Sequence, residues 1–409
     1  MIKRWSMLLI VATLFVFDLS AQQDIQELVK ANYELNESEL LDVSILIFDP
    51  GLPKKNEYKK EDKGVFPAVR RAESTYIPVR LMETLQATGY WGLVRVVPAN
   101  YVGGEIRISG VVKYSSGFRQ TLQIHAVDAT GKTFLKKNYK ARADIRGYRQ
   151  GDLESVMVDD PFHYLYNRIA NDLLDRRNML RQEDFKNIRQ VNDLKFAASL
   201  APDVFGDYLK VRKRKKGNRY KILKLPTADD PMLDRVAMIR DRDDLLTDTL
   251  TAYYNDFALR MAEPYNGWRK SSYEEEEAMR KIRREARAKQ IAGALLVIGA
   301  IMADGDSNGS RAAQQVGVIA GSQILQQGIQ QSAESKMHSE ALKELAASLD
   351  GEIRPILVEM QGRTIKLRGA AEAQYESWRQ MLQEIFNTEM GAPIDPNNST
   401  PTESGGPLQ

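Results

Sequence analysis

The strongest constraint on the fold is an alternation of apolar and polar residues between positions 105 and 127. The apolar positions are Ile106, Ile108, Gly110 and Val112 in one segment and Leu122, Ile124 and Ala126 in the next. A period of two residues puts successive side chains on opposite faces of a strand, so both segments are predicted to be half-buried strands. The turn sequence at 128–131 predicts a return strand that runs to about Lys140.

The segments before these strands predict a strand, a helix and a second strand. Residues 43–48 are mostly apolar and predict a buried strand, and residues 91–97 predict another that Pro98 closes. Ser74 is placed to cap a helix that ends at Gly89. Residues 49–66 are rich in Lys, Glu, Gly and Pro and predict a mobile loop. The order β-α-β-β-β-β favours an antiparallel sheet with a helix packed on one face.

Helical spacing replaces strand spacing after residue 160. Asp160-Pro161 and Asp230-Pro231 both predict helix starts, because Asp can accept hydrogen bonds from first-turn amides and Pro fits the first helical position. Ser271, with Glu274 at capping-box spacing, predicts the start of a further long helix. The expected class is α+β: an antiparallel sheet with a packed helix, then a mainly helical body, then a small carboxyl-terminal α/β unit.

Residues 208–225 predict a strongly basic hairpin, with a turn at Gly217-Asn218. Its cations are Lys210, Arg212, Lys213, Arg214, Lys215, Lys216, Arg219 and Lys221. One interpretation is a solvated edge whose lysines block strand pairing with other chains. The other is a binding surface for anionic lipid headgroups, lipopolysaccharide phosphates or an acidic envelope protein, since each cation near an anionic membrane contributes about 1 kcal/mol.

The amino terminus predicts export. Lys3 and Arg4 precede an apolar run at 7–17, and Ala21 supplies the small residue of a cleavage site. The run is shorter than the ~18–20 apolar residues of a membrane-spanning helix. Residues 1–21 are therefore predicted to be a cleaved signal peptide, and the protein is expected either in the periplasm or in association with the outer membrane.

Composition excludes several kinds of chemistry and of binding partner. The chain of 409 residues has no cysteine, which excludes disulfides, thiol catalysis and lipoprotein acylation. Export, a formal net charge of only +3 and the lack of a stacking-aromatic motif argue against nucleic acid as a partner.

Shifts in composition along the chain also predict its domain boundaries. Residues 24–150 are predicted to be an α/β interaction domain and 151–290 the helical body with the basic hairpin. Residues 291–335 form a Gly/Ala-rich helical hairpin, 336–390 a small α/β unit and 391–409 a disordered tail. Three roles remain open for the Gly/Ala-rich hairpin, whose backbones could approach closely: an interior helix pair, membrane insertion or homo-oligomerisation.

The loop at 304–309 matches two weak motifs. Gly305–Gly309 reads G-x-S-x-G around Ser307, the arrangement of a hydrolase nucleophile, but His338 is the only later histidine and a polar solvent loop explains the match better. Catalytic residues are therefore not assigned. A hydrolase whose site is built from residues distant in sequence is the rival hypothesis.

The same loop carries Asp304, Asp306 and Asn308 at the alternate spacing that opens an EF-hand. The twelfth position is Gln315 instead of the bidentate Glu. Weak calcium binding is the one cofactor expectation, against a plain solvent loop as the alternative.

Two parts of the chain resemble known families. Residues 42–141, with the strand at 43–48, the helix ending at Gly89 and the ladder at 105–114, resemble the small α/β domain of bacterial envelope assembly proteins such as the Tol-system propeller protein and the curli secretion-pore family. Residues 340–386, with a helix, a strand and Thr364–Gly369, resemble half of a BON domain. The resemblances imply a non-catalytic structural or assembly factor that contacts an anionic membrane surface or an envelope complex.

Overall fold

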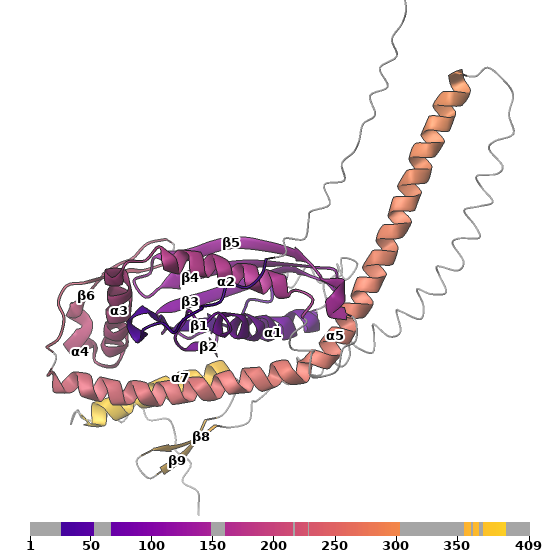
Figure 1. Cartoon of the computed structure of the whole chain (residues 1–409). Coiled ribbons are helices and arrows are strands. Elements are labelled where there is room, and N and C mark those ends of the chain that lie inside the picture. The colour runs from indigo at the N-terminus through magenta and orange to yellow at the C-terminus, as the bar shows by residue number, and fades with distance from the viewer. Residues whose placement is uncertain are drawn as a thin grey trace, which may run out of the picture.

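The structure is a computed structural model. It describes residues 26–52, 67–148, 160–215, 217–227, 229–302, 356–360, 363–367 and 371–389. The fold is α+β, as predicted: a five-stranded sheet covered by helices, a helical body and a carboxyl-terminal helix (Figure 1).

The sheet is mixed, so the expectation of a wholly antiparallel sheet was wrong. Its spatial order is β2 (Val94–Val97), β1 (Val43–Leu46), β3 (Ile106–Ser115), β4 (Arg119–Asp128) and β5 (Thr133–Arg142). The β3, β4 and β5 strands are antiparallel, but β1 pairs in parallel with both β2 and β3. The alternation of side chains does not encode strand direction. A strand–helix–strand crossover within one sheet, as in β1–α1–β2, returns the chain in parallel.

Helix α1 (Pro67–Gln86) begins well before Ser74, so the predicted cap was wrong. Pro67 occupies the start, where its missing amide hydrogen costs nothing. Ser74 lies inside the helix and donates from Oγ to the Arg71 carbonyl at 2.5 Å. Gly89 follows the helix end with φ of 71°, the left-handed conformation expected there. Helices α1 and α2 (His163–Asn178) pack against each other, and both contact the sheet.

Of the two predicted Asp-Pro helix starts, Asp230-Pro231 is confirmed, because Pro231 is the first residue of a helix. Asp160-Pro161 instead lies in the turn just before α2, which begins at His163 with Phe162 at its N-cap. Asp160 Oδ1 accepts a hydrogen bond from the Phe162 amide at 2.8 Å before α2, and Asp230 Oδ1 accepts one from the Met232 amide at 2.9 Å in the first turn of α5 (Pro231–Met302). Helices α3 (Gln182–Leu200) and α4 (Pro202–Phe205) lie between them.

The predicted helix start at Ser271 was wrong, because α5 passes through this position without a break. The reason is tertiary packing: Tyr265 and Trp268, about one helical turn apart on the same face, are both buried in the core. The helix contains Pro264, a residue that bends helices, and α5 first follows the body and then turns away from it (Figure 1).

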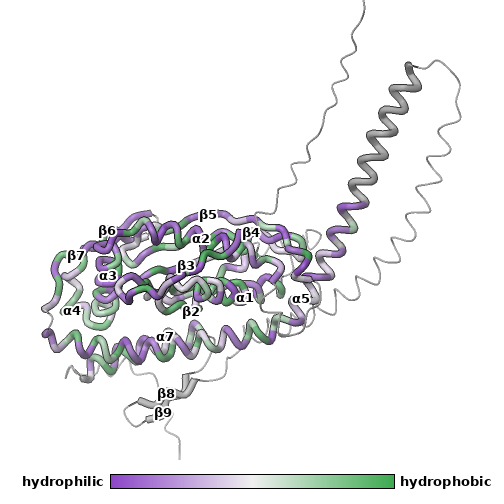
Figure 2. Tube along the Cα trace, in the orientation of Figure 1, coloured by the Kyte–Doolittle hydropathy of each residue, from purple (hydrophilic) through white to green (hydrophobic). Residues whose placement is uncertain are grey.

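One continuous hydrophobic core unites the sheet, the helical body and α7 (Ala371–Glu389), and it extends from Leu41 to Phe386 (Figure 2). The antiparallel pair β8 (Ile356–Met360) and β9 (Arg363–Leu367) precedes α7, in agreement with the expected strand-turn-strand-helix order. In α7 the side chains of Tyr375 and Trp378 are buried.

A buried ionic network fastens α5 to α1 and to the start of α2. Asp160 Oδ2 accepts hydrogen bonds from Tyr76 Oη and Arg269 Nη1, both at 3.0 Å. The exposed fraction is 5% for Asp160 and 1% for Arg269. Burial raises the pKa of Asp160, but the charge of Arg269, the hydrogen bonds from Arg269 and the Phe162 amide, and the charge of Arg80 together outweigh burial and keep this pKa below its ordinary value.

Several predictions lie outside the described residues. They concern the signal peptide 1–21, most of the loop at 49–66, the Gly/Ala-rich hairpin apart from the backbone of 291–302, the tail 391–409, Ser307 and His338, and the calcium ligands Asp304, Asp306 and Asn308. In the described part of the chain, no helix is long and apolar enough to cross a membrane. The same part holds no group of three His, Asp or Glu side chains arranged for a metal ion.

Candidate functional site

The basic segment forms the predicted hairpin, from β6 (Leu209–Arg212) and β7 (Arg219–Ile222). Its register pairs Lys210 with Lys221 and Arg212 with Arg219; the intervening pairs are Leu209 with Ile222 and Val211 with Tyr220. Because side chains alternate between faces, one face of the hairpin is cationic and the other is apolar. Like charges directly opposite each other destabilise a strand pair, so this arrangement carries a cost in stability.

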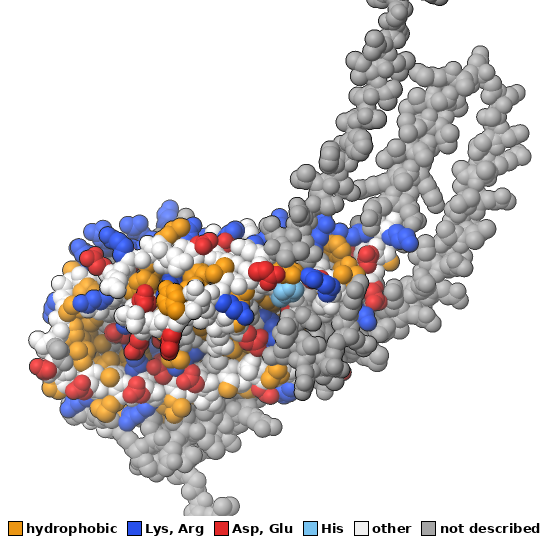
Figure 3. All heavy atoms as spheres, in the orientation of Figure 1, with side chains coloured by type: hydrophobic (Ala, Val, Ile, Leu, Met, Phe, Trp, Pro, Cys, Tyr) orange, Lys and Arg blue, Asp and Glu red, His pale blue; other side chains and the backbone are white. Residues whose placement is uncertain are grey.

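The predicted cations occupy the strands and the connection between them. Lys213, Arg214 and Lys215 lie in the connection and are exposed, while Lys216 lies outside the described residues. Figure 3 shows Lys and Arg side chains gathered over the upper left of the molecule, where Figure 2 labels β6 and β7. Within the described ranges, no ion pair joins a cation of the hairpin to a carboxylate. The structure therefore brings these charges together without neutralising them.

Exposed apolar side chains accompany the cations. Val211 on β6 is 48% exposed, and Leu223 and Leu225, just after β7, are 59% and 52% exposed. Clustered cations beside exposed aliphatic side chains are typical of surfaces that rest on a membrane interface.

The hairpin is attached to the sheet at the β4–β5 turn. The Tyr220 amide donates to the Thr130 carbonyl at 2.9 Å. Gly131 has φ of 82°, and a Cβ atom at this position would collide with the Asn218 carbonyl. Only glycine satisfies both the backbone conformation and this close approach.

Replacing Gly131 with alanine is therefore expected to loosen the hairpin from the sheet and to lower the free energy of unfolding by about 1–2 kcal/mol. Denaturant unfolding measures the loss, and amide hydrogen exchange at Tyr220 should speed up. Gly206 is the control position, since no atom lies within contact distance of a Cβ there. Unchanged exchange at Tyr220 would contradict the attachment.

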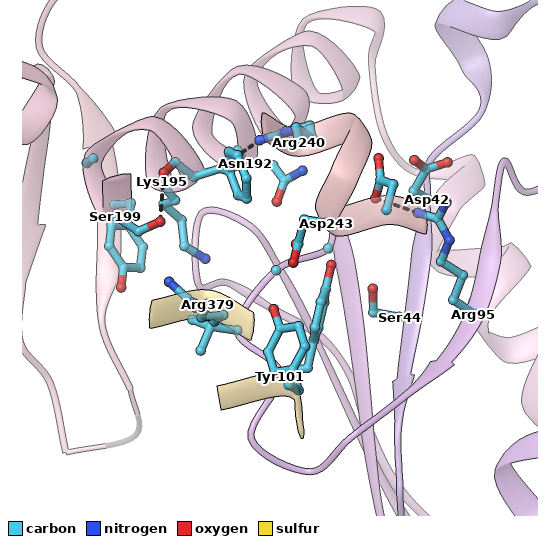
Figure 4. A pocket seen from close by; sticks show the side chains of 18 of the residues that line it. Asp42, Ser44, Arg95, Tyr101, Asn192, Lys195, Ser199, Arg240, Asp243 and Arg379 are labelled. Atoms are coloured by element: carbon cyan, nitrogen blue, oxygen red, sulfur yellow. Dashed lines mark hydrogen bonds and ion pairs between the residues drawn. The ribbon is translucent and has the colours of Figure 1, made fainter. Parts of the chain in front are cut away.

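The apolar face of the hairpin borders a cavity of about 380 Å³. Its walls come from the start of β1, the loop after β2, α3, β6, β7, the first turns of α5, and α7. The polar side chains in the lining are Asp42, Ser44, Arg95, Tyr101, Asn192, Lys195, Ser199, Tyr220, Arg240, Asp243, Asp244, Tyr375 and Arg379 (Figure 4).

Two of the cations are held in ion pairs in the cavity wall. Arg95 bonds Asp244 at 2.8 Å and Asp248 at 2.6 Å, and Arg240 bonds Asp193 at 2.6 Å. These pairs tie α5 to β2 and to α3 and leave the two arginines little capacity for a ligand. They make the wall rigid, which suits a binding site.

Asp243 differs from the other carboxylates of the cavity. It is 6% exposed, and its Oδ1 has no hydrogen-bond partner in the described part of the chain. Burial and the neighbouring charge of Asp244 raise its pKa to about 6, against the opposing effects of Arg379, Arg240 and a hydrogen bond from the Trp378 indole. The carboxyl is therefore held by the Trp378 indole and keeps capacity to accept a further hydrogen bond from a ligand in the cavity.

Among the described residues, no carboxylate pairs with Lys195. Its Nζ lies 4.9 Å from the ring centroid of Tyr220, and burial, with a smaller effect from Arg107, lowers its pKa to about 8. Figure 4 shows Lys195 and Arg379 extending into the cavity from one side, with Asp243 across from them. The rings of Tyr101 and Tyr375 pack 5.3 Å apart beside it.

The hairpin could be predicted from the sequence, but this cavity could not. The lining residues come from segments hundreds of positions apart, and no spacing connects them. One local signal was present. Gly103-Gly104 lines the cavity, Gly104 has φ of 98°, and a Cβ there would press on Ser44. A glycine pair after a strand is typical of such a close approach.

In the comparisons with known proteins, matches come from solved structures alone. No protein-family model and no curated protein sequence matches this chain. Four chains of solved structures match, among them a PelC dodecamer from Paraburkholderia phytofirmans. That match has 17% sequence identity and a TM-score of 0.21, and it covers 35% of this chain and 95% of that chain. A likeness of this size carries no information about a site.

Proposed function

We propose that this chain is an exported, non-catalytic cell-envelope protein that docks on an anionic lipid surface through the β6–β7 hairpin. The observation that carries the proposal is the juxtaposition of unneutralised hairpin cations with the exposed aliphatic residues Leu223 and Leu225 just after β7. Cations attract phosphate headgroups, and aliphatic side chains gain free energy on entering the interface.

The register of the hairpin favours docking over simple edge protection. A protective edge needs scattered lysines, whereas this hairpin sets Lys210 against Lys221 and Arg212 against Arg219. Direct like-charge pairs cost stability. A surface that concentrates positive charge at such a cost is best explained by an anionic partner. The amino-terminal segment supports export, which places the chain beside envelope lipids.

The rival hydrolase hypothesis would use the cavity, where titratable groups converge. Hydrolysis by paired carboxylates needs two carboxyl groups that face the same bond. Asp244 is bound by Arg95, and Asp42 Oδ1 accepts the Leu93 amide at 2.8 Å. Among the carboxylates that line the cavity, Asp243 is the one with a buried oxygen that lacks a partner. A single such carboxylate favours binding over turnover.

The test is vesicle co-sedimentation of the full chain. We expect binding to phosphatidylglycerol-containing vesicles, weak binding to pure phosphatidylcholine, and a loss of affinity as salt increases. The double variant Lys213→Gln/Lys215→Gln should weaken binding roughly tenfold or more, because each cation contributes about 1 kcal/mol near an anionic membrane.

Lys30→Gln/Lys270→Gln is the matched control, since both lysines are exposed and lie outside the hairpin. A further variant, Leu223→Ser/Leu225→Ser, should weaken the part of vesicle binding that persists at high salt. Equal binding to neutral and anionic vesicles, or no effect of the hairpin variant, would refute lipid docking. Capture of an acidic envelope protein without any vesicle binding would shift the partner from lipid to protein.

A further inference from the structure

The cavity beside the hairpin has the composition of a ligand site, and its two sides have opposite chemistry. Lys195 and Arg379 contribute positive charge on one side. Across from them, Asp243 presents an oxygen that accepts no hydrogen bond within the described residues. The volume of about 380 Å³ falls in the range of small-molecule sites.

The charges on the two sides set what can bind. Lys195 has no ion-pair partner in the described ranges, so an incoming anion would gain a charge-assisted hydrogen bond there. Asp243 can accept hydrogen bonds beyond the one from the Trp378 indole, and an ammonium or hydroxyl group of a ligand would supply such a donor. An apolar ligand would leave both groups unsatisfied at a cost comparable to a lost hydrogen bond for each.

The aromatic residues fit the same chemistry. Tyr101 and Tyr375 are buried beside Asp243, and burial raises the pKa of both, so their hydroxyl groups stay protonated. They offer neutral donors and acceptors next to the carboxylate. The ion-paired Arg95 and Arg240 hold the surrounding wall in place.

We propose that this cavity binds a small carboxylate ligand that carries an amine or hydroxyl donor, with its carboxylate at Lys195 and Arg379 and its donor at Asp243. Two kinds of compound share this chemistry: zwitterionic amino acids or short peptides, and hydroxy acids such as uronic acid sugars. In both, an anion and a donor lie a few bonds apart, as the two sides of the cavity require.

Isothermal titration of the full chain tests the proposal with two sets of probes. One set is alanine, dialanine and glutamate; the other is glycerate, glucuronate and galacturonate. We expect heat of binding with at least one set. Binding of the first identifies an ammonium at Asp243, and binding of the second identifies a hydroxyl. Propionate lacks the donor and alaninamide lacks the anion, so both should bind at least tenfold more weakly.

Variants connect the heat to the named residues. Asp243→Asn and Lys195→Met should each weaken binding about tenfold or more, because each removes one charge-assisted hydrogen bond. Lys195→Arg should retain part of the affinity. Lys186→Met, an exposed lysine on the same helix, is the control and should bind like the parent. Thermal unfolding of each variant shows that it is folded.

The proposal fails if neither set of probes binds, if propionate binds as tightly as the zwitterions or hydroxy acids, or if the folded Asp243 and Lys195 variants bind like the parent. This outcome is distinguishable from a failure of lipid docking. Lys213→Gln/Lys215→Gln changes no residue of the cavity lining and should keep ligand affinity unchanged.

Discussion

Replacing Asp160 with alanine is expected to lower the free energy of unfolding by about 3–5 kcal/mol, the cost of leaving one charge of a buried ion pair without its partner. Arg269 would remain in the core after its carboxylate is removed, and Tyr76 would lose the acceptor of its hydroxyl group. The variant would also lose the hydrogen bond to the Phe162 amide at the start of α2. Urea unfolding monitored by circular dichroism measures the effect.

A double-mutant cycle separates the ion pair from these other losses. Asp160→Ala/Arg269→Met should recover a large part of the stability, because it removes the stranded charge. Asp256→Ala is the matched control on α5: it breaks an exposed pair with Arg260 at 2.8 Å, and such pairs contribute at most about 1 kcal/mol. If Asp160→Ala costs no more than this control, the buried network does not hold α5 to the body.

Replacing Asp243 with asparagine is expected to stabilise the protein at about pH 8 by roughly 2–3 kcal/mol and to change little at about pH 4. The pKa of this carboxyl is about 6 in the folded state, against an ordinary value of 3.8. Between these values the folded state binds more protons than the unfolded state, so stability falls as pH rises through the window. Above it, the folded protein carries the full cost of a buried charge, which asparagine removes.

Chemical unfolding of the parent and of the variant at both pH values measures this difference. Asp241→Asn is the control, because Asp241 is exposed on the same helix and should change stability by less than about 0.5 kcal/mol at either pH. A loss of stability at about pH 8 would contradict the assignment. Together with the expected loss of ligand affinity, a gain would mean that Asp243 is kept at a cost in stability for the sake of binding.

The sequence predicted those elements whose signals are local. Asp230-Pro231 places a side-chain acceptor and a proline at a helix start, and the structure confirms it. Asp160-Pro161 forms the turn that leads into α2, two residues before the helix itself begins. The turn at Gly217-Asn218 likewise defined the hairpin, in which Gly217 has φ of 114°. Such features depend on neighbouring residues only, and a single sequence contains them.

The predictions that failed depended on contacts distant in the chain. Ser271 matches a capping box, but α5 continues through it because Tyr265 and Trp268 pack in the core. The direction of β1 depends on its neighbours in space, which the alternation of its side chains does not reveal. The cavity was missed for the same reason: Lys195, Asp243 and Arg379 meet only after α3, α5 and α7 have packed together.

The β6–β7 hairpin borders two surfaces at once. Val211 and Tyr220 line the cavity from the same short strands that hold the exposed cations. Any shift of these strands therefore changes both the shape of the proposed lipid-docking surface and the volume of the cavity. Thermodynamic linkage then requires the two effects to be equal. If a ligand in the cavity changes the affinity of the hairpin for lipid by some factor, lipid changes the affinity of the cavity for that ligand by the same factor.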